Sequence, residues 1–436
     1  MRPTPLVAAA LAAGLALAAC TSGGGDPAPG EPVTISVWVA GDPAETQAFV
    51  DVARGFEASQ RGIEVDLLQI AERDDLIARL STSFAGGEPP DLFLMNYRYL
   101  GQFESKGVLE PLEPYLASSS ELSAEDFYPE AMAAFQSDGM QTCMPQNVAS
   151  LVMYFNRDLF ERAGVEQPAA GWTWNDMVVA ATELTRDIDG DGAVDVYGLG
   201  VDPEIIRVAP FVWSAGGELV DDPERPTRFT IGSLKAIRPL QAFLDLRGVA
   251  GVTPTDEEAE AADFETRFLD GTLAMVMESR KVVPSFRTIT DFRWDVAPLP
   301  VHERPATILH SDAYCMTSAS EHGAEAWTFL EFALGPEGQR IATATGRTVP
   351  SLRSVAESGA FLDPSVPPAS SQAFLDAIGA IQAVPHIETW PEIEDVVNAL
   401  IEEAYYDPSG RGEAGELVLA IFDQTQPLFD RANAGG

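Results

Sequence analysis

Histidine and cysteine are scarce in this chain of 436 residues, which contains four histidines and three cysteines. No metal-ligand spacing relates the histidines, which are His302, His310, His322 and His386. The sequence also lacks G-x-S-x-G, H-E-x-x-H, phosphate-loop and G-x-G-x-x-G motifs, which excludes the enzyme classes that these motifs mark. A glycoside hydrolase stays open, because its two carboxylates carry no motif and 67 acidic residues make any pair uninformative.

Basic residues are few, with 27 Lys and Arg against 67 Asp and Glu, so the formal net charge is −40. This balance excludes nucleic acid as a partner, because binding to phosphates depends on Lys and Arg. It equally argues against a protein that rests on anionic lipid. The charge suits a soluble body and says nothing about the fold.

Long apolar runs are absent beyond residues 6–19, and that run is shorter than the roughly 20 residues of a membrane-spanning helix. With Arg2 before it, the run predicts a signal peptide at residues 1–19. Leu17-Ala18-Ala19-Cys20 resembles the lipobox of bacterial lipoproteins, which implies cleavage before Cys20 and its lipidation. Residues 20–32 then form a tether at the outer face of the cell membrane. The alternative is an ordinary signal peptide that contains a cysteine.

The remaining chain is too long for one hydrophobic core, so two domains are expected. Strand patterns at 34–39, 63–70 and 91–95 alternate with helical patterns, which predicts an open α/β sheet. Ligands bind beyond the carboxyl ends of such strands. A second unit begins near Asn147, with a strand at 151–155 and a helix that Thr173 and Asp176 cap. Further helices are predicted at 233–246, 256–269, 323–334, 370–381, 391–406 and 412–429, and further strands at 273–277, 294–298 and 314–317.

Several segments, in order, resemble the maltose-binding-protein-like branch of extracellular solute-binding proteins. They are Asp91–Leu94, Tyr154–Phe160, Gly171–Trp174, Phe268–Met275, Ala297–Pro300, Ala326–Leu330 and Gly346–Pro350. The resemblance implies two α/β lobes, each an open and mostly parallel sheet, joined by crossings near 144–147, 297–300 and 347–351. The first lobe would comprise 33–145 with 298–347, and the second 146–297 with 348–436.

The same resemblance implies a binding protein without catalytic activity, expected as a monomer. It would capture a small polar ligand, a mono- or oligosaccharide, between the lobes and deliver it to the permease of an ABC transporter. The alternative classes are a secreted hydrolase that uses paired carboxylates and a calcium-stabilised adhesin, and the absence of repeats weighs against the adhesin.

Candidate ligand residues are aromatic side chains that could cover a sugar ring and polar side chains that could hold hydroxyl groups. The aromatic candidates are Trp38, Tyr97, Tyr154, Trp213 and Trp390, with Gly216 beside Trp213. The polar candidates are Asp42, Glu72, Arg73, Asn96, Asn147, Glu278, Ser279, Ser311, Asp312 and Arg347. The strongest expectations are Asn96, Tyr97, Asp312, Trp213 and Glu278. The resembled family has a glycine followed by a tryptophan at the position around Glu278. This chain lacks that pair, so a charged ligand stays open as an alternative.

An acidic loop at 187–195 matches the first nine positions of an EF-hand loop. Its predicted ligands to a structural Ca²⁺ are Asp187, Asp189, Asp191, the carbonyl of Ala193 and Asp195. Gly198 occupies the twelfth position, where a bidentate Glu is usual, so a weak site or an acidic turn without metal is the alternative.

Cys143 and Cys315 are the only cysteines after Cys20. An even pair in an exported chain suggests a disulfide, with two free thiols as the alternative. The resemblance would place both residues on neighbouring strands of the first lobe.

Overall fold

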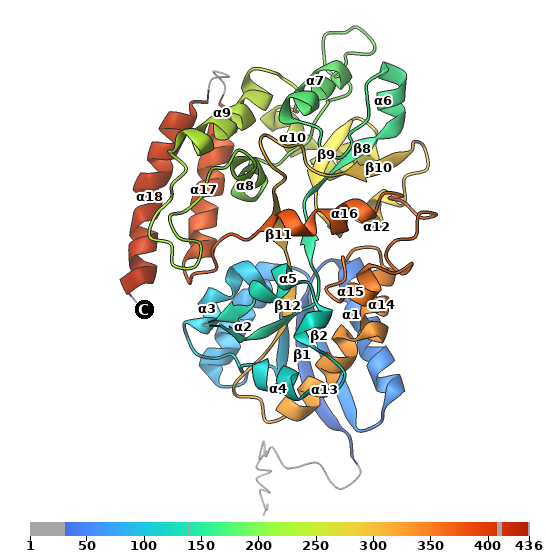
Figure 1. Ribbon diagram of the computed structural model, residues 1–436, viewed down its shortest axis with the longest axis vertical. Helices are drawn as coiled ribbons and strands as arrows, with labels where there is room; N and C mark the ends of the chain where they lie inside the picture. The colour runs from blue at the N-terminus through green and yellow to red at the C-terminus, as the bar shows by residue number, and fades with distance from the viewer. Residues whose placement is uncertain (1–30, 138, 408–411, 435–436) are drawn as a thin grey trace, which may run out of the picture.

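The structure is a computed structural model that describes residues 31–137, 139–407 and 412–434. The predicted signal peptide and Cys20 lie outside these residues. Figure 1 shows two lobes stacked along the longest axis, with the chain passing between them at β11 (Thr307–His310). The predicted two-lobed α/β fold is therefore confirmed. Among the described residues, no helix combines the length and apolar character that a bilayer crossing needs.

The first lobe is built on a five-stranded sheet in the order β2-β1-β3-β12-β6. Its strands are β1 (Val33–Ala40), β2 (Ile63–Ile70), β3 (Leu92–Asn96), β6 (Cys143–Pro145) and β12 (Asp312–Met316). β1 pairs in parallel with β2 and β3, whereas β12 is antiparallel to both β3 and β6. The predicted strands at 34–39, 63–70, 91–95 and 314–317 are confirmed.

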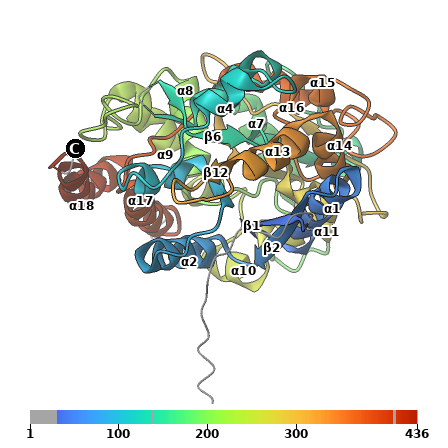
Figure 2. The ribbon, with the colours of Figure 1, turned by 90° about the horizontal axis from the view of Figure 1, so that it is seen from below.

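Apolar side chains recur at helical spacing in the helices that cover this sheet. The longer ones are α1 (Pro43–Ser59), α2 (Arg73–Gly86), α13 (Gly323–Leu334) and α14 (Pro336–Ala344). Phe56 of α1 packs edge-on against Phe329 of α13, and α1 lies beside α14 in Figures 1 and 2. Gly87, with φ +77°, ends α2 in the left-handed conformation that glycine tolerates. The short elements are η1 (Tyr97–Tyr99), α3 (Gly101–Glu104), α4 (Glu113–Ser118), η2 (Ala124–Asp126), α5 (Pro129–Ala133), β4 (Gln136–Ser137), β5 (Met140–Gln141) and α15 (Arg353–Ala356).

The second lobe contains a three-stranded sheet, β10-β8-β9. The strands are β8 (Val152–Asn156), β9 (Met275–Glu278) and β10 (Trp294–Ala297), and both pairings are antiparallel. The expectation of a mostly parallel sheet is wrong for this lobe. The segment that runs parallel to β9 forms only isolated bridges, such as Gly200 with Val276, rather than a strand.

Helices surround the second sheet, and Figure 2 shows the last two side by side at one end of the molecule. The helices of the second lobe are α6 (Arg157–Ala163), α7 (Trp174–Leu184), α8 (Ile205–Ser214), α9 (Leu234–Gly248), α10 (Asp256–Ala261), α11 (Phe264–Leu269), η3 (Arg280–Val282), α12 (Val283–Phe286), α16 (Gln372–Asp376), η4 (Ile378–Ala380), α17 (Trp390–Tyr405) and α18 (Ala414–Ala434). The capping box of Thr173 and Asp176 is present. The predicted helix at 256–269 breaks in two because Ala262 is extended and Asp263 caps a new helix. The predicted helix at 370–381 shortens to α16 and η4.

A small sheet forms the waist and carries the chain from lobe to lobe. It consists of β7 (Ala149–Ser150), β11 (Thr307–His310) and β13 (Ile381–Gln382), in the order β13-β11-β7. β7 leads into β8 of the second lobe, and β11 leads into β12 of the first. Val148 beside β7 donates its backbone N–H to the carbonyl of Val349 (3.0 Å), so the predicted third crossing segment lies at the waist. The second crossing lies at β11 and not at 297–300, because Val301 is still hydrogen-bonded to Trp172 and Trp174 of the second lobe.

Cys143 and Cys315 form a disulfide with a Cα–Cα separation of 4.4 Å. The two residues face each other across β6 and β12. The bridge therefore lies within the first sheet, a short distance before the chain enters the waist.

Candidate functional site

Asp312 lies where the first sheet meets the waist, and three side chains converge on its carboxylate. Asn96 donates its amide to Oδ1 (3.1 Å), and Arg73 contacts the same oxygen (3.4 Å). Asn147 donates to Oδ2 (3.3 Å). These side chains are brought together because β12 starts opposite the end of β3. The structure thus assembles four of the predicted polar residues into one cluster.

Ser311 and Asn147 are the scaffold of this cluster. The Ser311 hydroxyl donates to the carbonyl of Asn147 (2.6 Å), and Asn147 Oδ1 accepts from the backbone N–H of Asp312 (3.2 Å). Ser311 is wholly buried, so it positions Asp312 and does not itself face the space between the lobes.

Arg347 connects the two lobes. Its guanidinium pairs with Asp42 (2.5 Å) and with Glu45 (2.7 Å) at the start of α1 in the first lobe. The same group donates to the backbone carbonyl of Lys281 in the second lobe (3.1 Å). Burial raises the pKa of Glu45, and the positive charge of Arg347 opposes that rise.

Glu278 ends β9 and is the buried carboxylate of the second lobe. It pairs with Arg207 of α8 and with Lys281 (3.2 Å), and it accepts the backbone N–H of Ser279 (2.6 Å). Burial alone would raise the pKa of Glu278, but Arg207 and Lys281 outweigh it and lower the pKa to about 2. Glu278 is therefore ionised, and both of its oxygens are engaged.

Arg98 and Glu394 form a second contact between lobes. Arg98 belongs to η1, directly after β3, and pairs with Glu394 of α17. Arg98 also donates to Asn96 Oδ1 (3.1 Å), which joins this pair to the Asp312 cluster. Burial raises the pKa of Glu394, and the charge of Arg98 opposes the rise.

His310 ends β11 between these groups. Burial, followed by the charges of Arg207 and Arg98, holds the pKa of His310 well below its ordinary value, so the ring is neutral at pH 7. Its Nε2 has no hydrogen-bond partner among the described residues, and neither do Nε and Nη1 of Arg207.

We call these side chains the junction cluster; it comprises Asp42, Glu45, Arg73, Asn96, Arg98, Asn147, Arg207, Glu278, Lys281, His310, Asp312, Arg347 and Glu394. The residues that were not predicted are Glu45, Arg98, Arg207, Lys281, His310 and Glu394. The sequence contains one feature that indicates Arg207: it is the only charged residue of the largely apolar helix α8.

The predicted aromatic platforms lie in the core instead. Tyr97, Tyr154 and Trp390 are fully buried, and Trp213 is 3% exposed. Tyr97 accepts the backbone N–H of Val384 at its hydroxyl (3.2 Å), and Tyr154 donates to the carbonyl of Ser279 (2.8 Å). These rings fill the apolar interior because their helices and strands turn that face inward. None of them offers a free face to a sugar.

Three further candidates lie apart from the junction cluster or at its edge. Trp38 is half-buried in β1, with the Arg79 guanidinium 5.3 Å from its ring centre. Gly216 follows Trp213, and a Cβ there would meet Lys235 rather than a junction residue. Glu72 is exposed at the start of α2 and caps no backbone group.

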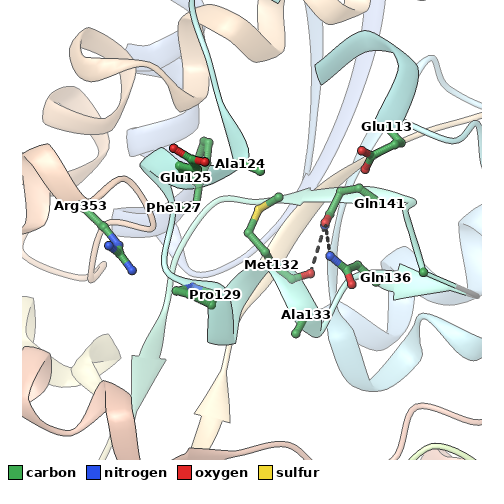
Figure 3. Close-up of a pocket in the computed structure, with 11 residues that line it drawn as sticks. Glu113, Ala124, Glu125, Phe127, Pro129, Met132, Ala133, Gln136, Gln141 and Arg353 are labelled. Atoms are coloured by element: carbon green, nitrogen blue, oxygen red, sulfur yellow. Dashed lines mark hydrogen bonds between the residues drawn. The ribbon is translucent and has the colours of Figure 1, made fainter. Parts of the chain in front are cut away.

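A groove of about 630 Å³ opens elsewhere, on the first lobe (Figure 3). Phe127, Met132 and Arg353 contribute to its lining, and Gln141 is tied to Gln136 and to the carbonyl of Met132. It contains none of the predicted ligand residues and draws on one lobe only. The convergence of charged groups from both lobes makes the junction cluster the better candidate site.

The acidic loop draws three of its aspartates together. The carboxylates of Asp187, Asp189 and Asp195 lie within 4.8 Å of one another, and all three residues are exposed. Asp191, which was also predicted as a ligand, accepts the backbone N–H of Ala193 (2.8 Å). The donor set of three hard carboxylate oxygens suits Ca²⁺.

Comparison with known proteins gives matches along most of the chain. The model of a family described as bacterial extracellular solute-binding protein matches residues 40–340. A binding protein of Brucella abortus (strain 2308) is 26% identical over 383 residues, which cover 85% of this chain and 87% of that protein.

Solved structures of similar shape cover nearly the whole chain. An ABC substrate-binding protein from Listeria monocytogenes in complex with cycloalternan has a TM-score of 0.80 at 24% identity and covers 93% of this chain and 99% of its own. The sugar-binding protein MalE from Xanthomonas citri has a TM-score of 0.81 at 21% identity, and the match covers 92% of this chain and 98% of that protein. At these identities the likeness shows a shared fold.

The pairing of Glu278 predicts a pH-dependent loss of stability in Glu278→Gln. Because the folded-state pKa is depressed, the stabilisation is present above the unfolded-state pKa of about 4.3 and is lost as pH falls towards 2. At pH 7 the variant should lose roughly 3–5 kcal/mol of unfolding free energy, since Arg207 remains buried. Urea titrations at several pH values measure this difference, with exposed Glu183→Gln as control. If the difference in unfolding free energy between wild type and Glu278→Gln does not change with pH, the prediction is contradicted.

Proposed function

The chain belongs to the family of bacterial extracellular solute-binding proteins, and on that premise we propose that it captures a carbohydrate between its lobes and delivers it to an ABC transporter. The observation that carries the proposal is the junction cluster, in which Arg347 and Arg98 of the first lobe meet the backbone carbonyl of Lys281 and the carboxylate of Glu394 of the second. The similar Listeria protein holds cycloalternan, and a similar protein from Arthrobacter globiformis binds cyclic alpha-maltosyl-1,6-maltose; both ligands are carbohydrates.

The chemistry of the junction suits a ligand rich in hydroxyl groups. A hydroxyl both donates and accepts, so it can bridge a carboxylate and a guanidinium at once. Such charge-assisted hydrogen bonds are stronger than neutral ones. A ligand that touches both lobes favours the closed arrangement, because only differential affinity shifts that equilibrium. The short strands of the waist would take up the hinge motion.

A secreted glycoside hydrolase is the weaker proposal. Such an enzyme needs a carboxyl group whose raised pKa keeps it protonated as general acid. Glu278 has the opposite shift, to about 2. Burial raises the pKa values of Glu45, Glu204 and Glu394, but the charge of a neighbouring arginine opposes each rise, from Arg347, Arg207 and Arg98 respectively. These features favour binding without turnover.

Calorimetry with neutral sugars tests the proposal, and chromatography of the same samples shows whether the ligand is recovered intact. Asp312→Asn should weaken binding at least about tenfold by removing a charged acceptor, which corresponds to roughly 1.4 kcal/mol. Asp423→Asn on the exposed face of α18 should bind like the wild type. Solution scattering should show compaction on ligand addition. Turnover of the sugar, or equal loss in both variants, would refute the proposal.

We further propose that Cys20 is lipidated and anchors the protein outside the cytoplasm. The Leu17–Cys20 segment supports this, and two or more acyl chains give stable attachment. Cys20→Ala should move the protein from the membrane fraction to the soluble fraction, while Ser22→Ala should leave it membrane-bound. Fractionation and blotting measure the distribution. A Cys20→Ala protein that stays with the membrane would rule the anchor out.

We also propose that the loop at 187–195 binds a structural Ca²⁺ through Asp187, Asp189 and Asp195. The spacing of the motif and the approach of the three carboxylates support it. Chelation should lower the melting temperature of the wild type, since an ion bound only to the folded state stabilises it. Asp187→Asn with Asp195→Asn should lose this sensitivity. A wild type that melts at the same temperature with and without chelator would contradict the site.

A further inference from the structure

We infer that the waist contains a proton-operated switch, in which addition of a proton to the imidazole of His310 separates the two lobes. The switch acts on the ligand-free protein, so it is independent of the solute that the chain carries. Three observations support it: the place of His310 in the waist, the enclosure of its ring nitrogen, and the charged groups that face the ring from both lobes.

His310 lies where the chain passes from one lobe to the other. It is the last residue of β11, which Figure 1 shows between the lobes. Its backbone pairs with Ala149 of β7, the strand that leads the chain into the second lobe. Two residues further on, Asp312 already belongs to the first sheet. Rotation of one lobe against the other therefore bends the chain beside His310.

The ring of His310 is enclosed at one nitrogen. Nε2 is closed off from solvent and has no hydrogen-bond partner among the described residues. The neighbouring strands offer no titratable group, since β7 contributes Ala149 and Ser150 and β13 contributes Ile381 and Gln382. In the doubly protonated ring Nε2 is always a donor. While the lobes stay together that donor has no acceptor, which costs free energy.

Three cations and one carboxylate face the ring from both lobes. The cations are Arg207 of α8, which packs on β11, Lys281 of η3 and, from the first lobe, Arg98 of η1. The carboxylate is Glu278, which favours a proton on the ring but is shared between Arg207 and Lys281. Burial and the cations prevail, so the pKa of His310 lies well below its ordinary value in the closed molecule.

The other charged residues around the ring are engaged elsewhere. Asp202 pairs with Arg207 (3.4 Å), and Asp312 pairs with Arg73 (3.4 Å). Arg280 of η3 lies over a phenylalanine ring, 4.3 Å from its centre. Their charges act on His310 less than the four groups that face it.

Four carboxyl groups near the waist respond to acid in the opposite direction. Burial raises the pKa values of Glu45, Glu204, Glu394 and Asp395. Protonation of these groups therefore favours the arrangement in which they are buried, which is the closed one. Opening of the lobes on acidification is thus the response that His310 produces and these carboxyl groups do not.

Acid favours the open lobes because His310 has different pKa values in the two arrangements. When the lobes separate, Arg98 leaves with the first lobe and water reaches the ring, so the pKa returns to about 6.5. Because the closed-state pKa is depressed, the closed arrangement has its full stability above about pH 6.5 and loses it as the pH falls. The opening equilibrium should shift about tenfold for each pH unit below that value.

Histidine-selective NMR and small-angle scattering test the switch on the ligand-free protein between about pH 7.5 and 5. The chain has four histidines, so the variants His302→Asn, His310→Asn, His322→Asn and His386→Asn assign each ring by the signal that disappears. The radius of gyration of the wild type should rise as the pH falls below about 6.5, while the His310 ring titrates over the same range. His310→Asn should stay compact throughout.

Two of these variants are the controls. His322 precedes α13, outside the waist, so His322→Asn should open like the wild type. His386 is the competing candidate, because burial lowers its pKa as well. His386→Asn should also open like the wild type. Circular dichroism at each pH checks that every protein stays folded, and His310→Gln replaces His310→Asn if the latter does not fold.

Several results would overturn the switch. One is a wild-type radius of gyration that stays constant across the whole pH range, or a wild type that unfolds before it opens. Another is a His310 variant that opens over the same range as the wild type. A His310 ring that titrates while the molecule stays compact shows that the closed lobes accept the proton. Loss of opening in His386→Asn alone would assign the switch to His386 instead.

Discussion

Ionised side chains buried between two lobes need partners of opposite charge, and this requirement organises the centre of the molecule. Taking an ion out of water costs several kcal/mol unless a partner compensates. Arg98 of η1, Arg207 of α8 and Arg347, which follows α14, each pair with a carboxylate at the waist. Two of these arginines join one lobe to the other. The relative placement of η1, α17 and the segment that follows α14 is therefore constrained by charge as well as by apolar packing.

Local patterns predicted the first sheet, most of the longer helices and the cap at Thr173, because alternation and helical spacing act over a few residues. The site was predicted only in part. The apolar pattern around Trp213 shows that its helix has a buried face, but not whether that face meets a ligand or the core. Arg207 is conspicuous as the charged residue of α8, but its partner Glu278 is 71 residues away, and no local pattern indicates that pairing. The three strands of the second sheet were predicted, but their antiparallel pairing was not, because the pattern within one strand does not give the direction of its neighbour.

Fold and ligand are decided by different parts of this chain. Proteins with TM-scores near 0.80 share its architecture at 21–24% identity, so widely different sequences specify the same two lobes. The side chains that face the junction lie at the end of β3, the end of β9 and the start of β12. Here they are amides, carboxylates and guanidinium groups, which replace the aromatic surface expected from the resemblance.

The disulfide between Cys143 and Cys315 has a mechanical consequence. It joins residues 172 positions apart, and the closed loop contains all three strands of the second sheet. Tension applied to the first lobe, from β1 to α14, passes through the covalent bridge and bypasses that loop. At about 3.4 Å per extended residue, roughly 600 Å of chain is shielded from such a pull. The second sheet could open and refold without lengthening the path along which the force runs.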